Sequence, residues 1–419
     1  MAFNAYEEKK IGHDSEISGL RATYLTDDSA VHVIGGQLEY EQIPDFTQTI
    51  DMNVAGINLQ RRVKGGFFLG GSFLRSKISQ EPGYFRDTFS MNIAELSGEY
   101  KGETLQLFTS LTSNENESNR LFIKGNISAY IGASLSKGHL GLSLEYKNYR
   151  FGLAPPNLSS QSFRHRRLLP LQNPPACVRE YSWTFLSRRS TGIDFNDEVG
   201  FLADAYYALR PGTTVNLSVS LASRHYDYER VSGGYRRIDS GHSWLPSTGK
   251  EYSPYWQVYS DIEHFFKNGS SLTAGAAYTC ENNYNFYYPE KEEIVRMATV
   301  PIHSQIILSP RYALQCTAEY QYSQETQYSH SWYSDGILTL GLSQAPSLNF
   351  SVVAEVLEGN AKYSEKKTWV YGSMSYRFRS RQYVELGYGE TRGGMSCTNG
   401  ICRFVQPFRG FRLTATYNY

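Results

Sequence analysis

Residues 121–135 alternate between apolar and polar side chains at every second position. Successive side chains of a strand point to opposite faces, so this run predicts a strand with one apolar and one polar face. Fifteen extended residues span about 50 Å at about 3.3 Å each, far longer than an ordinary soluble strand. Ile127 would lie on the apolar face and Ser128 on the polar one. If this strand crosses a membrane and Ile127 lies at mid-bilayer, Ile127→Arg should impair insertion of the chain. Ser128→Arg, on the polar face, should impair insertion less.

The same alternation recurs along the whole chain, while helical periodicity is nearly absent. Further apolar faces occur at 105–111, 140–146, 215–221, 348–356, 370–378 and 411–419. The chain also contains 33 Tyr and 22 Phe, residues that favour strands and boundaries between apolar and wet surroundings. This pattern indicates about 16–20 strands.

Short and long connections alternate between these runs. The short ones contain good turn residues, at Lys64-Gly65-Gly66, Lys101-Gly102, Lys137-Gly138, Pro211-Gly212 and Asn268-Gly269. The long ones lie near 79–88, 152–180, 225–253, 281–293 and 390–407. Short turns at one end and long loops at the other are typical of outer-membrane barrels. We therefore predict an all-β fold, an antiparallel up-and-down transmembrane β-barrel formed by residues 1–419 as a single unit, with residues 1–19 leading into it.

Composition excludes several other classes. No stretch approaches 18 consecutive apolar residues, so a transmembrane helix is not expected. The 41 basic and 41 acidic side chains give no net charge, which argues against a nucleic-acid partner. A large soluble β-sandwich or propeller is the alternative fold, but its strands would be shorter than these runs.

The carboxy-terminal strand ends on Tyr419, with apolar or aromatic residues at every second position before it. A terminal strand of this kind resembles the signal that the barrel-assembly machinery reads. It predicts that machinery, outer-membrane lipid and lipopolysaccharide as partners, other outer-membrane proteins as further candidates, and a cell outer membrane location.

Cys397 and Cys402 flank Asn399-Gly400. This spacing can close a hairpin tip as a disulfide in an oxidising compartment. A zinc site would need two further ligands, and none is visible nearby. We favour the disulfide, with free thiols as the alternative.

Three blocks of sequence carry a family resemblance. They are Ala5-Tyr6-Glu7-Glu8-Lys9-Lys10-Ile11-Gly12-His13-Asp14 with Gly19-Leu20-Arg21, Asp197-Glu198-Val199-Gly200-Phe201 with Asp204, and Tyr388–Val405, which contains both cysteines. Together they resemble a Bacteroidetes family of outer-membrane β-barrel proteins that is catalogued as a domain of unknown function. The resemblance implies a barrel in the outer membrane and no defined activity. In that family a signal peptide and the first strands precede the first block, so this chain is expected to lack them. Residues 168–183 depart from the pattern of the family.

No motif for catalysis, cofactors or metals is present: the chain has neither His-Glu-x-x-His nor Gly-x-Ser-x-Gly. We expect no enzyme activity and no cofactor. Arg164, Arg166 and Arg167 form the strongest charge cluster, and Arg179, Arg188 and Arg189 follow in the same connection. Arginines that line a pore select anions, whereas an exposed loop would contact lipopolysaccharide phosphates or water.

The polar faces of the strands suit a barrel interior, either as a hydrated channel or as a closed interior with salt bridges. We therefore expect porin-like passage of small solutes or a non-enzymatic structural role. The alternative is an accessory barrel that scaffolds an outer-membrane secretion or assembly complex. A wide polar lumen with no plug would favour the pore, and a lumen filled by the 152–180 or 225–253 loop, beside a flat apolar outer patch, would favour the scaffold. A surface adhesin that uses the Tyr-rich loops is a weaker third candidate.

Overall fold

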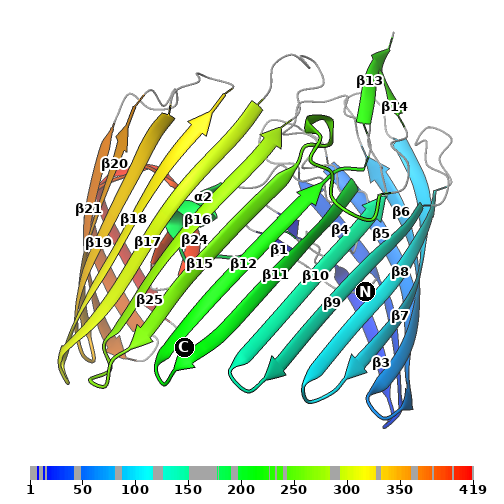
Figure 1. Cartoon of the computed structure of the whole chain (residues 1–419), viewed down its shortest axis with the longest axis horizontal. Coiled ribbons are helices and arrows are strands. Elements are labelled where there is room, and N and C mark those ends of the chain that lie inside the picture. Colours follow the sequence, from blue (N-terminus) through cyan, green and yellow to red (C-terminus); the bar gives the residue numbers. More distant parts are fainter. Residues whose placement is uncertain are drawn as a thin grey trace.

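A computed structural model gives the architecture of the chain (Figure 1). It describes residues 7–8, 13–14, 17–41, 49–80, 87–116, 126–150, 177, 179–189, 197–225, 227–231, 234–238, 243–283, 293–326, 332–359, 367–379, 382–398 and 401–417. Nineteen antiparallel strands form one up-and-down barrel, which confirms the predicted fold class. Since the number of strands is odd, the first strand of the series and the last run in the same direction.

The barrel strands are β3 (Ser18–Leu25), β4 (Ser29–Glu41), β5 (Thr49–Lys64), β6 (Phe67–Gln80), β7 (Asp87–Lys101), β8 (Leu105–Asn116), β9 (Asn126–Lys137), β10 (Leu140–Arg150), β11 (Asp197–Arg210), β12 (Thr213–Ser223), β15 (Tyr255–Phe265), β16 (Ser271–Asn283), β17 (Glu293–Ser309), β18 (Tyr312–Glu325), β19 (Trp332–Gln344), β20 (Leu348–Glu358), β21 (Thr368–Arg379), β22 (Gln382–Thr391) and β25 (Phe408–Tyr417).

The remaining described elements precede β3 or lie between barrel strands, and they form no part of the barrel wall. They are the hairpins β1 (Glu7–Glu8) with β2 (His13–Asp14), β13 (Asp227–Val231) with β14 (Gly234–Ile238), and β23 (Gly394–Thr398) with β24 (Ile401–Val405), together with the helix α2 (Thr184–Arg188) and the 3₁₀ turn η1 (Lys250–Tyr252). Among the described residues, no helix has both the length and the apolar character needed to cross a membrane.

The short turns lie at the lower end of the barrel in Figure 1, and the hairpin of β13 and β14 rises at the upper end. The turn glycines explain the tight lower end: Gly65, Gly138, Gly212 and Gly269 have φ angles of 55°, 61°, 76° and 83°. These left-handed conformations carry little steric penalty for glycine. The predicted short turns are therefore confirmed where they were placed.

The outer face of the wall is aliphatic. Leu338, Leu340 and Leu342 occupy alternate positions of β19 and are about two-fifths exposed, while Asp335 and Ile337 on the other face are buried. The same division holds for the predicted pair on β9, because Ile127 is 66% exposed and Ser128 only 1%. The alternation in the sequence thus assigned the outward and inward faces correctly.

Aromatic side chains mark both ends of this outer face. On β18, Tyr312 lies at the short-turn end and Tyr322 near the other end, where its ring stacks on Trp332 with centroids 4.5 Å apart. Ten residues of strand span about 33 Å, or about 25 Å along the barrel axis at the usual strand tilt. That height matches the apolar band of a transmembrane barrel.

Part of the inner face is apolar and closely packed. The cluster contains Leu38, Met52, Val54, Leu74, Met91, Ile93 and Tyr149, from β4, β5, β6, β7 and β10, and Ile17 packs against it. These side chains lie on the inward face, opposite the outward-facing positions of the same strands. The interior of the barrel is therefore partly a hydrophobic core.

Candidate functional site: the interior of the barrel

The connection between β10 and β11 enters the barrel. Its residues 179–189, which we call the lumen segment, contain α2, visible behind the front strands in Figure 1. The segment contacts inward side chains of five wall strands, β11, β15, β16, β18 and β20. It therefore crosses much of the interior instead of lying over the rim.

The helix of the lumen segment begins on a carboxylate of the wall. The backbone amides of Thr184 and Phe185 donate to the two Glu319 oxygens, each at 2.8 Å. The first amides of a helix have no partners within the helix, and a carboxylate can satisfy them. Glu319 is only 4% exposed. A buried acid of β18 thus fixes the start of α2.

Arginines anchor the other end of the segment. Arg188 donates to both oxygens of Glu355, at 2.6 and 3.1 Å, and Arg392 donates to the same carboxylate and to Asp335, at 3.0 and 2.8 Å. Paired N–H···O bonds of this kind fix orientation as well as charge. Two guanidinium groups from different connections therefore share one acidic site on β19 and β20.

Arg189, the next residue after Arg188, is also paired with acids of the wall. Arg189 lies 2.9 Å from Glu325 and 3.6 Å from Glu281. Burial by itself would lower the pKa of Arg189, but the two carboxylates outweigh burial and the net direction is upward. At the start of the segment, Arg179 pairs with Asp204 at 2.8 Å. The three arginines of the lumen segment are thus neutralised by acids of the wall.

Aromatic packing completes the attachment. The indole of Trp183 donates to the Tyr259 hydroxyl at 2.8 Å, and the Tyr181 hydroxyl donates to Gln257 at 2.6 Å. The rings of Tyr181 and Tyr259 meet edge to face, with centroids 4.9 Å apart. All four side chains are buried, so the segment is held by packing as well as by charge.

A second buried network lies where β10, β11 and β12 reach the long loops. Lys147 and Glu198 pair at 3.1 Å with no exposed side-chain surface, and the Cys177 thiol lies 3.7 Å from the same glutamate. Burial raises the pKa of the Cys177 thiol, and the Glu198 carboxylate raises it further. This network ties residue 177, shortly before the lumen segment, to the wall.

His225 belongs to the same region. Its Nδ1 lies 3.1 Å from Asp197 and its Nε2 lies 3.1 Å from Asn148. Although His225 lies at the start of one of the long connections, its side chain is enclosed. Its two ring nitrogens are both engaged, so it holds the loop end to the wall.

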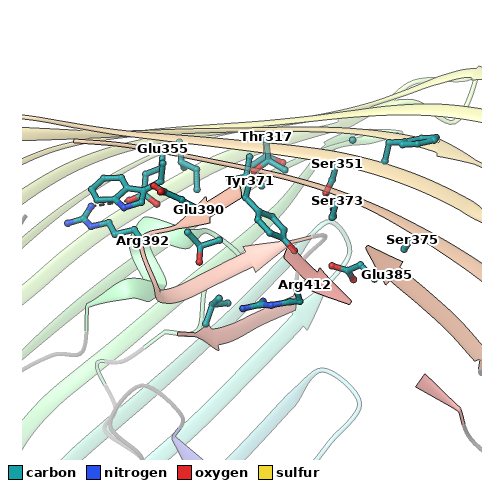
Figure 2. Close-up of a pocket in the computed structure, with 18 of the residues that line it drawn as sticks. Thr317, Ser351, Glu355, Tyr371, Ser373, Ser375, Glu385, Glu390, Arg392 and Arg412 are labelled. Atoms are coloured by element: carbon teal, nitrogen blue, oxygen red, sulfur yellow. Dashed lines mark hydrogen bonds and ion pairs between the residues drawn. The ribbon is translucent and has the colours of Figure 1, made fainter. Parts of the chain in front are cut away.

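A polar cavity of about 350 Å³ lies beside the lumen segment, against β18–β22 and β25 (Figure 2). Its lining includes Gln315, Thr317, Thr339, Asn349, Ser351, Ser373, Ser375, Tyr371, Trp369, Arg188, Arg392, Arg412, Glu355, Glu385 and Glu390. Three arginines and three glutamates among these leave its formal charge balanced. The Ser351 and Ser373 hydroxyls bond to each other at 2.9 Å. The wall here is rich in hydroxyl and amide groups.

The predicted site residues fall in different places. Arg164, Arg166 and Arg167 lie outside the described residues. Cys397 on β23 stands directly opposite Cys402 on β24 in the hairpin register, and their side chains lie outside the described ones. The disulfide stays a prediction. Across the part of the chain that the structure describes, no group of three or more His, Cys, Asp or Glu side chains is placed to hold a metal ion.

The acidic partners of the arginines were the residues that sequence reasoning missed. Glu319, Glu355 and Asp335 were assigned no site role, and Asp204 was noted only as part of the second block of the family resemblance. All four occupy inward positions of long alternating strands, a signal that was available. What the alternation cannot reveal is whether such an acid faces water or a segment of the same chain.

Nineteen antiparallel strands with an ion-paired segment in the interior define the class: an up-and-down β-barrel whose lumen is partly filled. Residues 1–419 match the model of the family described as "Family of unknown function (DUF6029)", and the chain belongs to that family. No curated protein matches it.

Several solved structures align with most of the chain. The copper transporter OprC has 8% identity and a TM-score of 0.46, over 96% of this chain and 68% of that one. The siderophore receptor PirA from Pseudomonas aeruginosa has 11% identity and a TM-score of 0.43, over 94% and 69%. OmpT of Vibrio cholerae has 8% identity and a TM-score of 0.33, over 94% and 98%.

Proposed function

We propose that the protein is an outer-membrane barrel through which small polar solutes pass along a lumen narrowed by the lumen segment. Three features support the membrane location: the outward leucines of β19, the aromatic ends of β18, and the separation of about 25 Å between those ends. With it we propose a Bacteroidetes outer membrane, contact with its lipid and lipopolysaccharide, and assembly through β25.

The observation that carries solute passage is the cavity of about 350 Å³ beside the lumen segment. Pockets of roughly 300–1,000 Å³ suit small molecules. Its walls offer hydroxyl, amide and charged groups of both signs, which replace the water around a polar solute. The lumen segment borders the cavity through Arg188, so the segment limits its width.

Conductance in a planar bilayer tests this function. The folded wild-type chain should give stable open steps. Glu319→Gln weakens the attachment of α2 and should give larger or noisier steps, because the helix amides lose their charged acceptor. Glu358→Gln, an exposed acid of the next wall strand but one, is the matched control and should leave the steps unchanged. Silence from folded samples of the wild type and both variants would overturn solute passage.

A scaffold is the second candidate, and one specific observation favours it. The inner apolar cluster around Met52 and Leu74 and the buried Lys147–Glu198 pair fill part of the interior, as a barrel with a structural role requires. Under this reading the folded chain is electrically silent and remains in a larger assembly after gentle solubilisation. Native mass measurement of the solubilised assembly distinguishes the two functions.

We also propose that the barrel has no enzymatic activity. Support comes from His225, which is enclosed and engaged at both ring nitrogens and so cannot reach a substrate. Hydrolysis of ester and peptide substrates by the purified barrel, at a rate that depends on a single side chain, would contradict this proposal.

A further inference from the structure

Two opposite charges in the cavity have no polar partner. Among the contacts of the described residues, Arg412 on β25 stacks on the Phe408 ring, with its guanidinium carbon 4.4 Å from the ring centroid, and makes no ion pair. Glu385 on β22 makes neither a hydrogen bond nor an ion pair within the same described part of the chain. Both line the cavity of about 350 Å³.

The register places these two charges side by side. Arg412 stands opposite Gly387, and Glu385 lies two residues from that glycine on the same strand face. Such diagonal neighbours have Cα atoms about 7–8 Å apart. A methyl group on Gly387 would overlap the Tyr371 hydroxyl, so this glycine makes room for the tyrosine over the strand. In Figure 2 the hydroxyl end of Tyr371 points toward the space between Arg412 and Glu385.

The other charges around the cavity are already matched. Arg188 and Arg392 are held by Glu355 and Asp335, and Glu390 pairs with Arg409 at 2.7 Å. The cavity therefore presents one free cation and one free anion from the described residues, on neighbouring strands, within a wall of hydroxyl groups. A ligand that matches this arrangement carries one charge of each sign.

We propose that this cavity binds a small zwitterion with a free carboxylate and a free ammonium group, such as an amino acid or a short peptide. Arg412 takes the carboxylate, since a guanidinium forms paired hydrogen bonds with that group. Glu385 takes the ammonium group. The hydroxyls of Thr317, Ser373 and Ser375 face the remainder of the ligand. The proposal names the solute class for the proposed passage, but the binding site itself does not depend on conductance.

Calorimetry on the full chain, folded in detergent, tests the site with alanyl-alanine as the probe. Two analogues remove one charge each: the N-acetylated dipeptide lacks the ammonium group and the dipeptide amide lacks the carboxylate. The free dipeptide should bind at least about tenfold more tightly than either analogue, a difference of about 1.4 kcal/mol.

The variants should change the selectivity in a crossed pattern. In Arg412→Gln the preference for the free dipeptide over its amide should disappear, while its preference over the acetylated form remains. In Glu385→Gln the reverse should hold. Arg311→Gln, in the short turn between β17 and β18, removes the same charge away from the cavity and should change neither preference.

The outcomes separate this proposal from solute passage. Equal binding of the three probes, absence of binding by folded wild-type chain, or identical loss in both variants would overturn the zwitterion site. Binding with the crossed pattern and no conductance would leave the site standing and overturn passage. Conductance without binding would overturn the zwitterion site and leave solute passage standing. Heat-modifiable migration of each variant on a gel shows that it is folded.

Discussion

The carboxylate of Glu355 on β20 holds the guanidinium of Arg188 inside the barrel through hydrogen bonds of 2.6 and 3.1 Å. The two residues are 167 positions apart in the chain. Arg392 shares the same acid. This one side chain therefore connects the wall, the lumen segment and the connection after β22.

Glu355→Gln should loosen the lumen segment. Arg188 and Arg392 would lose their common charged acceptor, and removing one member of a largely buried ion pair is costly. Because Arg188 is partly exposed, we expect a loss of about 1–3 kcal/mol, below the range for fully buried pairs. Limited proteolysis between β10 and β11 should become faster. Unchanged proteolysis relative to wild type would contradict the assigned role, and Glu358→Gln is the control.

The outer face predicts a contrast between two adjacent residues of β19. Leu340 points outward in the middle of the strand, whereas Thr339 lines the cavity. Leu340→Arg should destabilise the inserted barrel by about 2–4 kcal/mol. Thr339→Arg should cost much less, because its side chain enters a polar space. Urea unfolding from lipid vesicles measures both, and equal losses would contradict the membrane placement of this face.

This pair replaces the one suggested by the sequence. Ile127 does point outward, but it lies one residue from the described start of β9 and not at mid-strand. Ser128 points inward and is only 1% exposed, with its hydroxyl accepting from the Arg150 amide at 3.3 Å. An arginine at Ser128 would be overpacked, so it could not serve as the mild control.

The Cys177 thiol should resist alkylation in the folded barrel. Burial and the Glu198 carboxylate raise the pKa of this thiol, so less of the reactive thiolate exists at a given pH than for an ordinary cysteine. Iodoacetamide labelling followed by peptide mass analysis should find Cys177 unmodified at mildly alkaline pH, and modified after unfolding. Rapid labelling of the folded chain would contradict the buried position.

The hairpin of β23 and β24 should be closed by a disulfide between Cys397 and Cys402. Directly opposite residues of an antiparallel pair have Cα atoms about 4.5–5.5 Å apart, within the usual range for a disulfide. Mass analysis of protein from an oxidising compartment should find the peptide with two hydrogens fewer, and reduction should restore them. Two free thiols in that material would overturn the pairing.

Much of the fold could be predicted because the alternation of apolar and polar residues along a strand is visible directly in the sequence. The outward positions of the strands and the glycine turns were predicted where the structure has them. The length of the runs also favoured a membrane barrel over a soluble sheet. These properties depend on residues close together in the chain.

The filling of the interior could not be predicted in the same way. Met52 and Val54 precede Ile57 and Leu59 on β5, and the phase of the apolar positions changes between them. The change of phase can be read from the sequence, but the residues that these side chains contact across the barrel cannot. The position of Arg188 against Glu355 depends on where a distant connection folds, which local periodicity does not encode.

Attachment of the lumen segment to five wall strands limits how the barrel can deform. A sheet of antiparallel strands changes cross-section when neighbouring strands slide or splay. Between β11 and β20, such a movement would stretch ion pairs and hydrogen bonds that start from one short stretch of chain. We therefore expect this part of the wall and the lumen segment to move together. A change in the width of the lumen should come from detachment of the segment or from the strands outside β11–β20.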